Sequence, residues 1–357
     1  MINDFIYNSK KIKNIEGICE WRSPSNIALI KYWGKKQNQI PLNPSLSITL
    51  TNCFSQTKVS YKSRTESGEN FVFLFEGNLK PSFEKKLFQF FKRIYKYCPY
   101  LSFLDLKIES SNSFPHSSGI ASSASSYSAL SLCIMDIEKD LNPLIDDQYF
   151  FEKASFIARL GSGSASRSII GSFSIWGNNH FFQKSSDYYA IKYPNKIHNA
   201  FNEICDSVLI VDKGKKEVSS TIGHQLMEGH SFSNDRLNQV EINMGKLKNA
   251  LENGDYNTFI EIVELEALSL HAMMMTSSPY FILIKPNTLH IISLIWDYRK
   301  KNQSKICFTL DAGANIHLLY PKIEFDSVQE FIITKLSPFC ESNQFINDMI
   351  GNGPFKL

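Results

Sequence analysis

The chain has 357 residues, of which 43% are hydrophobic and 20% are charged, and its formal net charge is only +3. This composition is ordinary for a globular protein, and the length allows two domains. Because the net charge is close to zero, neither a nucleic acid nor a membrane surface is indicated as a partner, and any site for an anion must be local.

The cysteines and the N-terminus indicate the compartment. The 7 cysteines are scattered and form neither a C-x-x-C pair nor a Cys/His cluster, which favours reduced thiols over disulfides or structural zinc. Charges interrupt the first residues before an apolar run develops, so we expect neither a signal peptide nor an anchor. No window approaches about 18 consecutive apolar residues. We therefore expect a cytoplasmic protein.

Strands and helices alternate along the first half of the chain. Residues 45–63 alternate polar and apolar side chains with a period of two, residues 71–77 add a second strand, and we expect the two strands to be antiparallel neighbours. The further elements are a helix over 81–98, a strand over 105–112, a helix that begins at 148 and ends in a glycine and serine cluster, and a strand over 171–177.

The second half repeats a rhythm of strand, helix, helix and strand. The interruption of strand patterning at 193–200 predicts two domains, residues 1–198 and 199–357. A strand begins at 206, and residues 234–269 form a long helical region in which Gly254 is the expected break. A further helix covers 289–299, and residues 305–321 form a strand, a tight turn and a strand.

The segment from Phe114 to Leu130 is rich in serine around one glycine and then becomes helical in pattern. Small side chains let the backbone approach an anion closely, and the N–H groups at the start of the following helix point at its charge. The segment has neither G-x-x-x-x-G-K-[ST] nor G-x-G-x-x-G. A phosphate-binding loop and a small-residue helix packed closely against a sheet both remain open.

Three other segments carry residues suited to anions. KYWGKK places Lys31, Tyr32 and Lys35 near the end of an apolar segment, and GSGSASR combines serines with Arg167, whose planar guanidinium suits phosphate or carboxylate. KGKKEVSST adds lysines and serines, among them Ser220. Taken singly, each could be a solvated loop or a strand end. Together they predict a substrate that carries several phosphates.

Asp311 lies at the end of a predicted strand, directly before Ala312 and Gly313. Its carboxylate could face a cleft, or it could cap the turn through its own backbone. A carboxylate near several cations stays ionised, and it can then accept a hydrogen bond from a substrate hydroxyl.

Several motifs in order along the chain resemble those of the mevalonate diphosphate decarboxylase family, within the GHMP small-molecule kinase superfamily. The matching segments are NIALIKYWGK, FPHSSGIASSAS, GSGSASRSI, VSST, HAMMMTSSPYF and FTLDAGANIHLL. The chain departs from the family pattern at residues 116–118, where it has His-Ser-Ser instead of Thr-Ala-Ala.

The resemblance implies an α+β protein with the GHMP-kinase fold. The N-terminal half would resemble the second domain of ribosomal protein S5, the C-terminal half would be a ferredoxin-like α+β sandwich, and the active site would lie between them. It also implies ATP as co-substrate, Mg²⁺ bridging phosphate oxygens with protein ligands that the sequence does not identify, and a homodimer.

The resemblance also implies residue roles. The expected ATP-binding residues are Asn112, Ser117, Ser118, Gly119, Ser122, Ser123 and Ser125. The expected substrate-binding residues are Tyr32, Lys35, Ser162, Ser164, Arg167 and Ser220. Lys31 and Asp311 match the pair nearest the reacting hydroxyl of mevalonate 5-diphosphate, and together with Arg167 they are the expected catalytic residues.

These residue types suit ATP-dependent decarboxylation to isopentenyl diphosphate. Asp311 would orient the tertiary hydroxyl toward the γ-phosphate of ATP, while cations stabilise the charge on the transferring phosphoryl group. Three alternatives remain: a mevalonate 3-kinase, a phosphomevalonate decarboxylase, and a non-enzymatic RNA-binding protein. The joint presence of Lys31, Arg167 and Asp311 favours the decarboxylase over the kinase, and the near-neutral charge argues against RNA.

Overall fold

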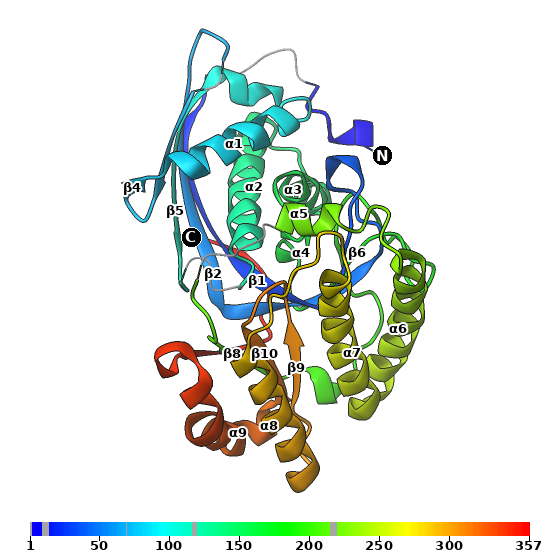
Figure 1. Cartoon of the computed structure of the whole chain (residues 1–357). Helices are drawn as coiled ribbons and strands as arrows, with labels where there is room; N and C mark the ends of the chain where they lie inside the picture. The colour runs from blue at the N-terminus through cyan, green and yellow to red at the C-terminus, as the bar shows by residue number, and fades with distance from the viewer. Residues whose placement is uncertain (1, 9–13, 69, 116–119, 215–219) are drawn as a thin grey trace.

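Two β-sheets, one mainly from each half of the chain, organise the fold (Figure 1). A computed structural model describes residues 2–8, 14–68, 70–115, 120–214 and 220–357. The larger sheet contains β1 (Glu16–Ile30), β2 (Ser45–Ser63), β3 (Phe71–Phe75), β4 (Asn78–Leu79), β5 (Leu104–Asn112), β6 (Phe173–Trp176), β7 (Ile191–Lys192) and β12 (Phe355–Lys356). Its order is β12-β1-β2-β5-β3-β4, with β6 paired to β2 and β7 paired to β6.

The alternating sequence of β2 explains its central place in this sheet. From Cys53 to Tyr61, every second side chain is buried and those between are less buried. β2 pairs with β1 on one side, and on the other side first with β6 and then with β5, always antiparallel. The strand predicted over residues 45–63 is confirmed.

The expectation that β2 and β3 are antiparallel neighbours is wrong. β5 lies between them, and β3 pairs with β5 in parallel, with Phe71 opposite Leu106. Parallel strands need a long crossover connection, and helix α1 (Pro81–Ile94) lies within the connection from β3 to β5. Period-two alternation identifies a strand but does not determine its neighbour.

Helices α1, α2 (Ser122–Leu141) and α3 (Asp147–Gly161) lie along one side of the larger sheet (Figure 1). Their apolar side chains, such as Phe90, Ile134 and Ile157, form one core with the sheet. α2 packs closely, because Ala124, Ser128 and Ala129 are small and buried. This part of α2 therefore fits the small-residue helix that was one of the two alternatives.

The smaller sheet has the order β11-β8-β10-β9, and all its pairs are antiparallel. Its strands are β8 (Ile204–Leu209), β9 (Cys307–Leu310), β10 (Ile316–Pro321) and β11 (Phe345–Met349). Helices α8 (Pro286–Asn302) and α9 (Phe325–Phe331) contribute to the core of this part. The prediction of an α+β fold with a sheet in each half is confirmed.

Three further helices belong to the second half: α5 (Ser220–Gln225), α6 (Ser233–Asn253) and α7 (Tyr256–Met275). α6 and α7 lie side by side (Figure 1), and α7 contacts both β1 and β9. Gly254 separates α6 from α7 with a φ of 77°, a left-handed conformation that favours glycine, so the predicted break is confirmed. No helix in the described ranges is long and apolar enough to cross a bilayer.

The chain crosses from the larger to the smaller sheet between β7 and β8, and the domain division expected at residues 198 and 199 falls in this interval. The C-terminal end of the chain then returns to the larger sheet. There β12 pairs with β1, with Trp21 opposite Lys356. The two halves are thereby joined twice.

Candidate active site

Lys31 and Asp311 form an ion pair where the two sheets meet. Each is the first residue after a strand, β1 and β9 respectively, and Nζ of Lys31 lies 3.2 Å from Oδ1 of Asp311. The Lys31 side chain is buried, whereas that of Asp311 is 31% exposed. Burial lowers the pKa of Lys31, and the charge of Asp311 opposes this shift. The Asp311 carboxylate is thus paired with a cation and still accessible to a substrate hydroxyl.

Arg167 is buried beside this pair in the short helix α4 (Ala165–Ser168). Its Nη1 donates a hydrogen bond to Oγ of Ser45 at 2.7 Å, and its Nε donates to Oδ1 of Asn26 at 3.2 Å. After burial, the proximity of Arg167 is a further cause that lowers the pKa of Lys31. The structure therefore brings together the three residues predicted to be catalytic.

Tyr32 continues this cluster. Its ring stacks on His224 of α5 with centroids 4.6 Å apart, meets Trp176 edge-on at 4.9 Å, and lies 5.5 Å from the Arg167 guanidinium carbon. Burial raises the pKa of Tyr32 to about 12. Burial also lowers the pKa of His224 to about 3, which keeps it neutral. The sequence around His224 does not indicate that this residue belongs to the site, because its partners lie near residue 32, far away in the chain.

Lys35 adds a half-buried cation. Its Nζ donates a hydrogen bond to Oε1 of Gln39 at 2.9 Å. Burial is the main cause that lowers the pKa of Lys35, and the nearby charge of Arg93 is a smaller one. Arg93, in the last turn of α1, donates from Nη1 to the carbonyl of Leu160 at 2.9 Å. It is a cation near the site that the sequence analysis missed, since nothing distinguishes it from the other basic residues of α1.

The predicted substrate serines lie in the turn between α3 and α4. Oγ of Ser162 and Oγ of Ser164 are 3.4 Å apart, and Ser162 lies 3.4 Å from Oγ of Ser123 in the first turn of α2. Ser123 is exposed. The predicted ATP loop and the predicted substrate cluster therefore adjoin.

Of the residues predicted to bind ATP, Asn112, Ser122 and Ser125 belong to one hydrogen-bond network around Ser55. Ser55 donates to Oδ1 of Asn112 at 2.6 Å and lies 2.7 Å from Oγ of Ser125, while Nδ2 of Asn112 donates to Oγ of Ser122 at 2.9 Å. Ser125 is fully buried. Its hydroxyl therefore faces the protein interior, whereas Ser122 and Ser123 lie at the open end of α2.

Three of the predicted ATP-binding residues, Ser117, Ser118 and Gly119, lie outside the described residues. The same is true of residues 215–219 in the lysine and serine segment. Ser220, predicted to bind substrate, is the first residue of α5.

A cavity opens beside the first turn of α2. Its walls include the rings of Phe73, Phe75, Phe83 and Tyr127, and its polar edge includes Ser122 and Ser123. Such a site suits a flat aromatic ligand whose charged end lies at the helix N-terminus. The phenylalanines belong to a predicted strand and a predicted helix, and no local pattern shows that their rings meet around a cavity.

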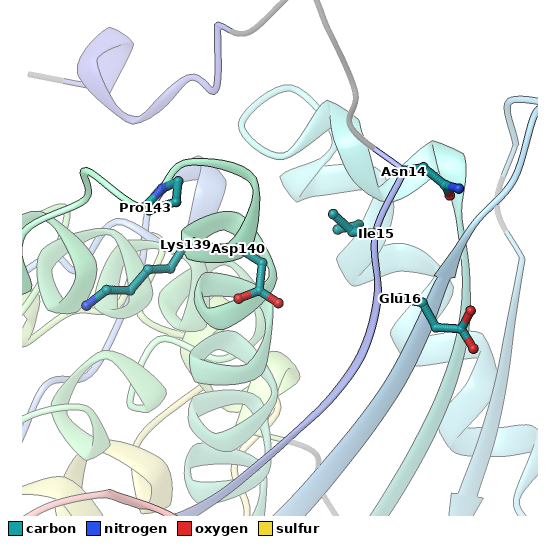
Figure 2. A pocket seen from close by; sticks show the side chains of 6 residues that line it. All are labelled: Asn14, Ile15, Glu16, Lys139, Asp140 and Pro143. Carbon is teal, nitrogen blue, oxygen red and sulfur yellow. The ribbon is translucent and has the colours of Figure 1, made fainter.

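A second pocket, shown in Figure 2, is lined by Asn14, Ile15, Glu16, Lys139, Asp140 and Pro143. Lys139 and Asp140 lie near the end of α2, roughly 25 Å along the helix axis from Ser123. None of the predicted site residues lines this pocket. The candidate active site therefore lies at the opposite end of α2, near Ser122 and Ser123.

The described residues do not form a ligand set for a metal ion. Within the described ranges there is no group of three or more His, Cys, Asp or Glu residues that could hold a metal ion. A cation that accompanies a nucleotide would have the phosphate oxygens as its main ligands.

The arrangement of the two sheets, with a serine-rich helix start beside the Lys31 and Asp311 pair, is that of an enzyme with the GHMP-type fold. Residues 23–189 match the diphosphomevalonate decarboxylase-like N-terminal domain, and residues 207–352 match the mevalonate 5-diphosphate decarboxylase C-terminal domain. A diphosphomevalonate decarboxylase of Aspergillus fumigatus is 30% identical over 340 residues, covering 89% of this chain and 80% of the relative. The chain belongs to the diphosphomevalonate decarboxylase family and is a decarboxylase.

Two solved structures resemble the fold of this protein over almost the whole chain. MDDEF in complex with MVAPP, AMPPCP and magnesium is 30% identical, with a TM-score of 0.81 and coverage of 96% of this chain and 99% of that chain. Mevalonate diphosphate decarboxylase from Staphylococcus aureus is 26% identical, with a TM-score of 0.82 and coverage of 96% and 98%.

Proposed function

We propose that the protein converts mevalonate 5-diphosphate and ATP to isopentenyl diphosphate, ADP, phosphate and CO₂, and that Lys31, Arg167 and Asp311 carry this reaction. The observation that supports these roles is the ion pair of 3.2 Å between buried Lys31 and partly exposed Asp311, with buried Arg167 beside it. The relative MDDEF forms a complex with MVAPP and AMPPCP, an analogue of ATP, and this supports a reaction between the same substrate and ATP.

In the first step Asp311 accepts a hydrogen bond from the C3 hydroxyl and directs its oxygen at the γ-phosphorus. The new O–P bond forms as the bond to the β-phosphate oxygen breaks, and ADP leaves. Lys31 and Arg167 stabilise charge on the transferring group, which is the main contribution a protein makes to phosphoryl transfer. A carboxylate paired with a cation is a weak base, so Asp311 chiefly orients the hydroxyl and takes its proton only late in the transfer.

In the second step the C3–O bond breaks and phosphate leaves with the electron pair. The bond between C2 and the carboxylate carbon then breaks, its electrons form the alkene, and CO₂ departs. Arg167 holds the carboxylate but must not bind it more tightly than the transition state. Phosphate leaves C3 and CO₂ leaves the adjacent C2, so the donors near Lys31 can serve both bond-breaking events.

The remaining site residues divide between the two substrates. The diphosphate and the carboxylate of the substrate contact Tyr32, Lys35, Ser162, Ser164, Arg167 and Ser220. The phosphates of ATP contact Asn112, Ser122, Ser123 and the predicted loop residues Ser117, Ser118 and Gly119, while Ser125 supports the start of the helix from within. The adenine ring occupies the aromatic cavity next to Ser122 and Ser123.

Mg²⁺ bound with the nucleotide would neutralise phosphate charge. The domains are residues 1–198 and 199–357, with the site between them. The protein works as a homodimer in the cytoplasm, and it needs neither nucleic acid nor a membrane.

The reaction is tested by product analysis. Purified protein with mevalonate 5-diphosphate, ATP and Mg²⁺ is expected to release ADP, phosphate and CO₂ in equal amounts. ADP without CO₂ would identify a 3-kinase, and faster turnover of the 5-monophosphate would identify a phosphomevalonate decarboxylase. The D311N variant should lose at least about a thousandfold in kcat while its affinity for ATP changes little. Retained turnover would remove Asp311 from the mechanism.

A further inference from the structure

The backbone of Lys31 is held by two side chains from helices of the other half of the chain and by one side chain from its own half. β1 ends at Ile30, one residue before it. The N–H of Lys31 donates to Oε2 of Glu266 at 2.9 Å, and its carbonyl accepts from Nη2 of Arg236 at 3.1 Å and from Nδ2 of Asn43 at 2.9 Å. Buried backbone groups need partners, and here three side chains provide them.

Glu266 is the centre of this arrangement and is fully buried. Arg236 of α6 pairs with it through two hydrogen bonds of 2.8 and 2.6 Å, and Nδ2 of Asn243 donates to Oε1 at 2.6 Å. A buried ion pair contributes little net stability compared with apolar residues of similar size. Its geometric effect is clear, however: α6 and α7 together determine where the main chain of Lys31 lies.

His271, on the same helix as Glu266, holds the other member of the reacting pair. Its Nε2 lies 3.1 Å from the carbonyl oxygen of Asp311. Because a carbonyl can only accept, Nε2 carries the proton. Burial lowers the pKa of His271 to about 4, so the imidazole is neutral and can keep this bond at neutral pH.

We infer that Glu266 and His271 of α7 are positioning residues for the decarboxylation: Glu266, supported by Arg236, places Lys31, and His271 places Asp311. The inference rests on the proposed roles of Lys31 and Asp311. α7 contacts both β1 and β9, the strands that end one residue before Lys31 and one residue before Asp311. One rigid helix therefore sets the direction in which the Lys31 amine and the Asp311 carboxylate meet, although they come from different sheets.

Such positioning should appear in kcat rather than in KM. A displacement of about 1 Å at reacting groups can cost on the order of a hundredfold in rate. Neither Glu266 nor His271 belongs to the residues proposed to contact substrate or nucleotide. Loss of either should therefore slow the chemical step and leave binding of both substrates nearly intact.

The test compares E266Q with E138Q. In E266Q the side-chain amide oxygen can still accept from the Lys31 N–H, but the charge that orients Arg236 is lost. The control changes another buried Glu with a buried cationic partner, Lys153 at 2.6 Å, in the core of the other half. For E266Q we expect kcat to fall by at least about tenfold, with both KM values within about threefold. E138Q should lose thermal stability while its kcat stays within about twofold.

His271 provides a second test that does not depend on a buried charge. H271A should lower kcat, and H271Q, whose amide can donate to the Asp311 carbonyl, should restore part of it. In a K31M background, E266Q should have little further effect on kcat, because it acts through Lys31. If E266Q does not fold, the His271 variants decide the matter.

The outcomes separate this inference from the proposed function. Full turnover in D311N would overturn the proposed roles of the pair. An inactive D311N with kcat unchanged in both E266Q and H271A would overturn the positioning role alone. Equal losses of kcat in E266Q and E138Q would also overturn it, because a general loss of packing would then explain both.

Discussion

The hydroxyl oxygens of Ser123 and Ser162 lie 3.4 Å apart, so the first turn of α2 touches the turn between α3 and α4. The two serines come from different motifs, one expected to bind ATP and the other the substrate diphosphate. With the proposed roles, their proximity would bring the two anions of the reaction together at one open helix start. The electric field of α2 and the hydroxyls of both motifs can then act on the same phosphates.

Ser123 and Ser125 should behave differently when changed to alanine. Ser123 is exposed at the helix start, whereas Ser125 is buried against Ser55. S123A is expected to raise KM for ATP several-fold without changing the melting temperature. S125A should lower the free energy of unfolding by about 1 kcal/mol, since it removes a buried hydrogen bond, with a smaller change in KM. Kinetics in ATP together with thermal melts of both variants check this, and a reversed pattern would contradict the assignment.

Local pattern was sufficient for many elements of this fold. Alternation over residues 45–63 predicted β2, and Gly254 predicted the end of α6, because both depend on neighbours in the chain. The position of β5 between β2 and β3 depends instead on the crossover through α1. Pattern alone also does not predict β12, whose partner β1 lies more than 300 residues earlier in the chain.

The site also contains residues that local motifs predict and residues that only tertiary contacts reveal. The residue types that bind phosphate are visible as motifs, and the resemblance to a family added their roles. Glu266, Arg236 and His224 could not be predicted, because their partners lie around residues 31 to 34, roughly 190 or more positions away. A buried polar side chain on a helix resembles any other until tertiary contacts show what it holds.

Replacing Arg167 should change the kinetic constants for mevalonate 5-diphosphate rather than the affinity for ATP. R167Q removes a permanent cation and the donors to Asn26 and Ser45, so both KM for mevalonate 5-diphosphate and kcat are expected to worsen, by about tenfold or more in kcat/KM. A matched control is R299Q, which breaks an ion pair with Glu264 outside the site. It should leave kcat/KM nearly unchanged. An effect of R167Q on ATP alone would show that the placement is mistaken.

Gly163 lies against Tyr32 and Trp176. A Cβ atom at Gly163 would come within 2.8 Å of the Tyr32 hydroxyl oxygen and of the Trp176 ring, so G163A must displace these groups or the backbone between them. Because Tyr32 borders the site, we expect kcat/KM for mevalonate 5-diphosphate to fall by about tenfold while the protein stays folded. G245A introduces a similar clash, 2.8 Å from the Phe181 ring, away from the site. Steady-state kinetics should be normal for G245A, and equal losses in the two variants would refute a specific effect through Tyr32.

The stability of the protein should fall as the pH is lowered, and His271 should account for part of this change. Its pKa is lowered by burial from 6.5 to about 4, so between these values the unfolded chain binds a proton that the folded chain does not. The free energy of unfolding therefore decreases as the pH falls through this window and is fully regained above it. H271Q removes this site, and the slope of stability against pH near pH 5 should decrease by up to about 1.4 kcal/mol per unit. Urea unfolding between pH 7 and pH 4.5 measures the slopes. H290Q, at an exposed histidine, is the control and should keep the original slope; an unchanged slope in H271Q would mean that His271 is protonated in the folded protein.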